Sequence, residues 1–208
     1  MEHGAALLQT FTGTFTFTRP SVGSGVLYGL GSENRNLPGY ITIKPALSHG
    51  GAKNWASGFL PGSVQGTAIG NAGMPVNEIQ KEPIEYLLNQ GLTREQQRYE
   101  LDMLQAINRK HQALWKFDDE LETRIQSFEM GFRIQAEASK VFYVSNESEA
   151  TKKLYGLDDP KTAVFVWHSL LARRLSSPDV RFFPSPPTSK CDQPPVLFHK
   201  HNATAAER

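Results

Sequence analysis

The feature that most constrains the fold of this chain is a helix-forming segment over residues 93–139. Thr93 and Gln96 form a capping-box pattern, in which each side chain bonds a backbone N–H that the first helical turn leaves free. Mostly apolar residues then recur at the three- and four-residue spacing of one helix face, at Leu101, Leu104, Ile107, His111 and Leu114. A second helix start at Asp118 or Asp119 precedes another stripe, at Leu121, Ile125, Phe128 and Phe132. The two runs predict an antiparallel helical hairpin with Lys116 and Phe117 at its turn.

Shorter patterns on both sides of the hairpin alternate between strand and helix. The run GYITIK at 39–44 predicts a short strand ended by Pro45, and VRFF at 180–183 predicts a buried strand ended by Pro184. Helices are predicted from Pro20 to Leu30, from Asn146 to Tyr155, and after Asp159-Pro160. The run TFTGTFTFT at 10–18 fits a strand and a loop equally, because Gly13 and the Arg19-Pro20 break interrupt it. This order of elements predicts the α/β class.

Residues 46–83 form a long glycine-rich stretch, and such loops inside a compact domain tend to be functional or disordered. Trp55, Phe59 and Leu60 favour an ordered loop. Open α/β sheets bind ligands in loops that follow strands, so His49, Asn54 and Trp55 are the best candidates for ligand contact. A structural role for all three is the competing interpretation, and the favoured one.

The other polar clusters have simpler explanations. Helix dipoles favour acids at the start of a helix and cations at its end, which accounts for the acidic run 118–122 and for Arg173 and Arg174. We expect His111 and His168 to pack in the core, whereas His199 and His201 lack a third metal ligand in register. Cys191, the single cysteine, has no activating neighbour. The residues themselves therefore indicate no catalytic residue, cofactor site or metal ligand.

Composition excludes several classes of protein. The 208 residues carry 22 basic and 21 acidic side chains, a net charge of +1, which argues against nucleic-acid binding. One cysteine excludes an intramolecular disulfide. No apolar stretch reaches the roughly 18–20 residues of a membrane span. The first residues show no signal peptide, so we expect a cytoplasmic protein as encoded, with partners unknown.

Residues 184–208 differ from the rest of the chain. They hold five of the 13 prolines and show no apolar periodicity, which predicts a disordered tail. The predicted organisation is one domain over 1–183 followed by a Pro-rich tail over 184–208. The abrupt change at Pro184 leads to the hypothesis of a frameshift or gene truncation, which sequencing the locus would test.

Six strings, taken together and in order, resemble one protein family. They are HGAALLQ with TG at 3–13, RPSVGSGVLYGLGSENRNLPGYI at 19–41, HGGAKNWASGFLPGSVQGT at 49–67, LTREQQRYELDMLQAINRKH at 92–111, LETRIQSFEMGFRIQ at 121–135 and KLYGLDDPKTAVFVWHSLLARRL at 153–175. Over residues 3–183 the chain is similar to the bacterial family known as domain of unknown function 1501, a sulfatase-like branch of the alkaline phosphatase superfamily. The resemblance implies a partial α/β fold with a central, mostly parallel sheet, flanking helices and the hairpin packed on that sheet.

The resemblance also implies a chemistry. Members of the superfamily are expected to hydrolyse sulfate or phosphate esters at a divalent-metal site, and full-length relatives typically carry a twin-arginine export signal. That site is assembled from both ends of the chain, and neither end shows the family motifs here, so no metal ligand or nucleophile carries over. We therefore expect an internal fragment without hydrolase activity or cofactor. The alternative is a non-catalytic module that binds a ligand or partner through residues 46–83.

Overall fold

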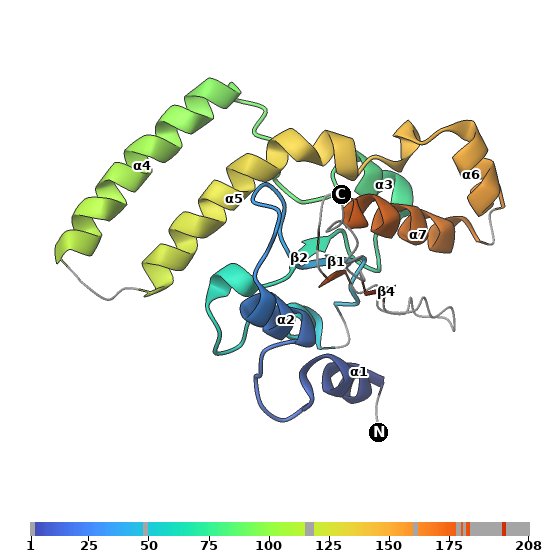
Figure 1. Cartoon of the computed structure of the whole chain (residues 1–208), viewed down its shortest axis with the longest axis horizontal. Helices are drawn as coiled ribbons and strands as arrows, with labels where there is room; N and C mark the ends of the chain where they lie inside the picture. Colours follow the sequence, from blue (N-terminus) through green and yellow to red (C-terminus); the bar gives the residue numbers. More distant parts are fainter. Residues whose placement is uncertain are drawn as a thin grey trace, which may run out of the picture.

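The computed structural model describes residues 3–47, 50–114, 119–159, 162–177, 180, 182–183 and 197–198. Helices dominate the fold and the strands are short (Figure 1). The α-helices are α1 (His3–Thr12), α2 (Val22–Leu30), α3 (Val76–Lys81), α4 (Arg94–Leu114), α5 (Asp119–Val141), α6 (Glu149–Tyr155) and α7 (Ala163–Ser176). The strands are β1 (Ile41–Ile43), β2 (Thr67–Ile69), β3 (Phe182–Phe183) and β4 (Leu197–Phe198), and the 3-10 helices are η1 (Gly51–Trp55), η2 (Gly62–Val64) and η3 (Val144–Asn146).

Two parallel strands lie at the centre of the fold. β1 pairs with β2 so that Ile41 lies beside Thr67 and Ile43 beside Ile69. All three residues of β1 are buried, which is the pattern of a parallel strand covered on both faces. The predicted α/β class is confirmed in this coarse form, a mostly helical protein with a small parallel sheet.

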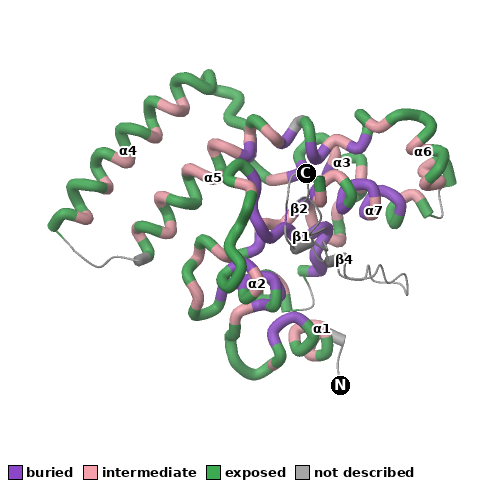
Figure 2. The backbone as a smooth tube through the Cα atoms, in the orientation of Figure 1, coloured by how far each residue is buried: buried purple, intermediate pink, exposed green. Residues whose placement is uncertain are grey.

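The main hydrophobic core lies between this sheet, α7 and the C-terminal part of α5. α5 contributes Ile134, Ala138 and Val141, and α7 contributes Val166, Trp167, Leu170, Leu171 and Leu175. Within each helix these positions are mostly three or four residues apart, so they form one face. Figure 2 shows the buried residues gathered around β1, β2 and α7, whereas the α4–α5 hairpin is mostly exposed or half-buried.

The described part of the glycine-rich stretch is ordered and contributes Trp55 to a second, smaller core cluster. Its members are Leu27, Tyr40 and Trp55. A Cβ at Gly66 would lie 2.8 Å from Tyr40 Cε1 and 2.9 Å from the Trp55 Cβ, so only glycine lets the loop pass this close. The predicted ordered loop is confirmed, although it also contains β2 and α3, which no pattern in the sequence predicts.

Several predicted boundaries are confirmed by their hydrogen bonds. The Thr93 N–H donates to Gln96 Oε1 at 2.8 Å and the Gln96 N–H donates to Thr93 Oγ1 at 3.2 Å, which is the predicted capping box. Gly31 and Gly156 end α2 and α6, each with a positive φ. By contrast, α1 covers residues for which we predicted no helix, and the threonine-rich run after it forms a loop rather than a strand.

The predicted hairpin is present, but α4 and α5 face each other largely through polar side chains. The half-buried residues of α4 are Gln97, Arg98, Leu101, Gln105, Asn108 and Gln112. Arg98 binds both carboxylate oxygens of Glu129, at 2.9 and 3.0 Å. Leu104, Ile107 and Leu114, which we predicted on the apolar contact face, are instead exposed. The turn at Lys116 and Phe117 lies outside the described residues.

A second strand pair joins the end of the predicted domain to the predicted tail. Phe182 and Phe183 of β3 pair antiparallel with Phe198 and Leu197 of β4. The strand predicted at 180–183 is therefore confirmed in its last two residues, and its partner comes from a segment that we predicted as disordered. The rest of 184–208, with Cys191, His199 and His201, lies outside the described residues.

Candidate functional site

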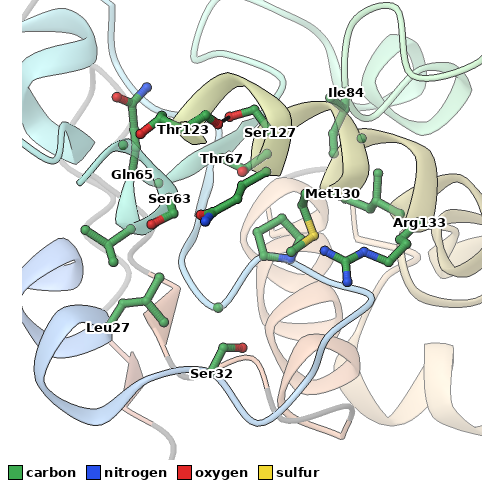
Figure 3. A pocket seen from close by; sticks show the side chains of 18 of the residues that line it. Leu27, Ser32, Ser63, Gln65, Thr67, Ile84, Thr123, Ser127, Met130 and Arg133 are labelled. Carbon is green, nitrogen blue, oxygen red and sulfur yellow. Dashed lines mark hydrogen bonds between the residues drawn. The ribbon is translucent and has the colours of Figure 1, made fainter. Parts of the chain in front are cut away.

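A cavity of about 710 Å³ opens beside the amino ends of β1 and β2. One wall is α5, and the facing walls are residues 62–67, residues 38–39 and the end of α2 (Figure 3). This volume lies within the range of about 300–1,000 Å³ that is usual for small-molecule sites. Parallel sheets more often bind ligands at the carboxyl ends of their strands. This cavity lies instead at the edge where the strands begin.

The cavity lining combines apolar side chains with hydroxyl and amide groups. The apolar members include Leu27, Val64, Ile84, Leu87, Met130 and Ile134, and the polar ones include Ser63, Gln65, Thr67, Thr123, Gln126, Ser127 and Gln135. Figure 3 shows Thr123, Ser127 and Met130 on the α5 wall and Ser63, Gln65 and Thr67 on the wall formed by η2 and β2. Such a lining can enclose an apolar body and orient it through hydrogen bonds.

Arg133 brings a permanent positive charge to this lining. Its side chain extends from α5 beside Met130 (Figure 3), and its Nε is buried without a hydrogen-bond partner among the described residues. A buried donor left unpaired costs about 1–3 kcal/mol. Because Nε is itself covered, a ligand oxygen in the cavity would be bound by the other N–H groups of this guanidinium. One carboxylate, that of the exposed Glu85, also lines the cavity.

A close approach of η2 to α5 sets the width of the cavity. A Cβ on Gly62 would collide with the methyl Cγ2 of Thr123, so the two walls meet here only because residue 62 is glycine. On the other side of the loop, the Gly66 N–H donates to the Trp55 carbonyl at 2.9 Å. Residues 62–67 are therefore held in place at one end by the contact with α5 and at the other by the hydrogen bond to Trp55.

Two of the three residues predicted for ligand contact lie behind this wall. Asn54 and Trp55 are 6% and 7% exposed, and neither lines the cavity. The Asn54 Nδ2 donates to the Gly51 carbonyl at 3.2 Å, and the Tyr40 hydroxyl donates to the Asn54 carbonyl at 3.4 Å. His49 lies outside the described residues. Asn54 and Trp55 thus support the loop from within, and a ligand contact by any of the three residues stays a prediction.

A buried basic pair lies at the other edge of the sheet, where β1 ends. Lys44 is 6% exposed, has a φ of +46°, and donates from Nζ to the Met74 carbonyl at 2.7 Å. Burial lowers the pKa of the Lys44 amine. Burial, assisted by the charge of Lys44, also lowers the pKa of His168 to about 4. His168 is therefore the core histidine that the sequence predicts, neutral at pH 7.

The remaining candidates have structural roles or exposed positions. Arg173 and Arg174 bind Glu147 at 2.6 and 2.8 Å, and these bonds hold the pKa of the Glu147 carboxyl below its usual value. His111 is exposed beside a smaller cavity of about 290 Å³ between α4 and α5, so the expectation that it packs in the core is wrong. The predicted helical stripe that contains His111 faces solvent because α4 packs on α5 through its polar side chains.

The described residues contain no group of three or more His, Cys, Asp or Glu side chains that could hold a metal ion. Within that same part of the chain, no helix is both long enough and apolar enough to span a membrane.

Sequence reasoning missed the cavity because its polar residues resemble an ordinary solvated helix face. Thr123, Ser127 and Met130 recur at four and three residues along α5, followed by Arg133 and Ile134. The available signal is that Thr123 and Ser127 are small and uncharged, whereas the neighbouring helix positions 122 and 124 are charged. Only the tertiary contact with residues 62–67 turns this stripe into a cavity wall.

A family model described as "Protein of unknown function (DUF1501)" matches residues 1–184. No curated protein and no solved structure matches the chain.

Proposed function

Because this chain belongs to the DUF1501 family of proteins of unknown function, we propose that it is sulfatase-like and that its described residues bind a small molecule without hydrolysing it. The single observation that carries the binding proposal is the cavity of about 710 Å³ lined by α5 and residues 62–67. The parallel pairing of β1 with β2 between helices supports the sulfatase-like relationship, since parallel sheets are built in this way. We also propose that the sulfatase-like domain ends near residue 183 and that residues 184–208 form a separate tail.

The ester hydrolysis that the family resemblance implies needs a divalent metal, and the described residues do not fit one. Metal-assisted hydrolysis requires several ligands and an activated nucleophile held together. No three such ligands converge in the described part of the chain. His168 lies beside the cationic Lys44, which would repel a metal ion. We therefore derive no hydrolytic step and assign binding alone to these residues.

The proposed ligand has an apolar body and one anionic oxygen group. The apolar side chains of the lining accept the body, and the Arg133 guanidinium accepts the charge. The Thr123 hydroxyl lies in the same lining and can donate to a further oxygen. The Ser127 hydroxyl already donates to the Thr123 carbonyl at 2.8 Å, so it can only accept from a ligand N–H or O–H. A carboxylate, a sulfate and a phosphate share this chemistry, so the binding experiment compares them.

The Arg133→Gln variant is expected to lose most of its affinity for anionic probes. We expect at least ~10-fold weaker binding of benzoate, phenyl sulfate and phenyl phosphate by isothermal titration calorimetry, because hydrogen bonds to charged groups contribute about 1.5–3 kcal/mol. Binding of uncharged benzyl alcohol should change little, since its contacts are to the apolar lining. Equal loss for the charged and uncharged probes would contradict the role of Arg133.

Two controls test whether the effect is specific to Arg133 and whether the protein hydrolyses esters. Arg124→Gln removes the same charge from an exposed position on α5 that lines only the smaller cavity, and it should bind the anionic probes like the parent protein. Assays with 4-nitrophenyl sulfate and 4-nitrophenyl phosphate in the presence of Ca²⁺, Mn²⁺ or Zn²⁺ should give no turnover. Metal-dependent turnover would overturn the non-hydrolytic proposal, and absence of saturable binding would overturn the cavity as a site.

A further inference from the structure

α4 presents its large apolar side chains to solvent. Tyr99, Met103, Ile107 and Leu114 are 72%, 57%, 57% and 79% exposed, and no described residue of this helix is buried. The side that faces α5 is instead polar, apart from Leu101 and from Ile107, which also lines the smaller cavity between the two helices. In a hairpin stabilised only by contacts between its own helices, the apolar side chains would face the other helix and the polar ones would face solvent. The exposed apolar side chains of α4 therefore indicate that its outer face contacts another molecule.

The outer face carries a regular seam. Tyr99, Met103, Ala106, Lys110 and Ala113 are separated by four, three, four and three residues, which is the spacing of a helix-pairing stripe. All five are exposed. The seam lies opposite the half-buried residues that contact α5, because those fall at 97, 101, 105, 108 and 112. Figure 1 shows α4 as the outermost helix of the molecule, with α5 on one side of it.

Charges on this outer face are separated along the helix. The acids Glu95 and Glu100 lie in the first half, and the bases Arg109 and Lys110 lie in the second, whereas Asp102 is paired with Arg98 at 2.6 Å. Two arginines of the first half turn towards α5. The Arg94 guanidinium lies 4.5 Å from the centre of the Phe132 ring, and Arg98 binds Glu129. The outer face is therefore acidic at one end and basic at the other.

We propose that this face binds the α4 helix of a second copy of the chain, in antiparallel orientation about a two-fold axis near Leu104. This arrangement places the acidic half of each helix against the basic half of the other, and the two Met103–Ala106 segments meet at the centre. A two-fold pairing is self-complementary and closes at two copies. The 21-residue helix is about 30 Å long, so the interface is small, and the dimer is weak and salt-sensitive.

Sedimentation velocity over a concentration series tests the apolar seam. The parent protein is expected to dimerise as its concentration rises, and added salt should weaken that dimer. Tyr99→Glu with Met103→Glu should weaken association at least ~10-fold, since both side chains belong to the seam and would be buried in the interface. Leu154→Glu, at an 82% exposed site on α6, serves as the matched control and should leave association unchanged. A parent protein that stays monomeric throughout would overturn the proposal.

Charge reversal tests the antiparallel orientation. A basic variant carries Glu95→Lys with Glu100→Lys, and an acidic variant carries Arg109→Glu with Lys110→Glu. Each variant alone should be monomeric because like charges face each other, and their mixture should form heterodimers by native mass spectrometry. All four positions are exposed, and circular dichroism checks that both variants fold. Homodimers that survive either reversal, or a mixture without heterodimers, would overturn the arrangement.

Discussion

Replacing Trp167 by alanine is expected to lower the free energy of unfolding by about 3–5 kcal/mol, the largest effect of any single truncation in the described core. Trp167 is 1% exposed and is among the largest of the fully buried side chains. It lies on the inner face of α7 together with Leu170 and Leu171, both 0% exposed. Because small domains are stable by only about 5–15 kcal/mol, this loss is a large fraction of the total stability.

Urea denaturation followed by circular dichroism at the helix band measures this loss. Trp167→Phe should cost much less than alanine, since it keeps most of the buried area and removes an Nε1 that has no hydrogen-bond partner among the described residues. Phe165→Ala, on the same helix but 44% exposed, should cost less than about 1 kcal/mol. If Trp167→Ala behaved like Phe165→Ala, the assignment of α7 to the core would be wrong.

The stability of the protein is expected to fall by about 3 kcal/mol between pH 6.5 and pH 4 because of His168 alone. Burial and the charge of Lys44 lower the pKa of this histidine from 6.5 to about 4. Between those two pH values the unfolded chain binds the proton and the folded chain does not, so acid favours unfolding. The stabilisation due to neutral His168 is fully present above the unfolded pKa of about 6.5. It decreases as the pH falls and is lost once the pH has fallen through the folded pKa of about 4.

A pH series of denaturation curves measures this loss, and a variant isolates its source. His168→Gln lacks the titrating group, so its stability should vary less between pH 6.5 and pH 5 than that of the parent protein. Glu122, Glu129 and Glu147 have carboxyl pKa values lowered by hydrogen bonds, so most of their effect falls below about pH 5, the lower end of this interval. An NMR titration that placed the His168 pKa near 6.5 in the folded protein would refute the prediction.

Local signals in the sequence predicted the elements that are stabilised by local interactions. The capping box at Thr93 and the glycine at 156 act within one helical turn, and both are where the sequence places them. The run GYITIK predicted β1 correctly, although the structure buries all three of its residues rather than alternate ones. β2 could not, because Thr67–Ile69 is extended only through its pairing with β1 across more than twenty residues. Tertiary contacts determine such short strands.

The candidate site was harder to predict than the fold. Sequence reasoning selected His49, Asn54 and Trp55 because polar and aromatic residues in a loop suggest ligand contact. The structure buries Asn54 and Trp55 behind the cavity wall, where Trp55 packs on Tyr40. Arg133 gave no signal, since an arginine on a predicted helix normally faces solvent. The helical periodicity of α4 likewise indicated a helix but not which of its faces meets α5.

The one-sided contact of α4 has a consequence for how the molecule opens. Hydrogen exchange at a backbone amide requires the local structure around it to open, and the free energy of opening follows the buried apolar contacts that must be broken. α7 can open only with the core, so its amides should exchange by global unfolding. α4 has no buried residue and contacts α5 mainly through polar groups, so it can detach and re-form while the core stays intact. The protein is in this sense two cooperative units of unequal stability within one continuous chain.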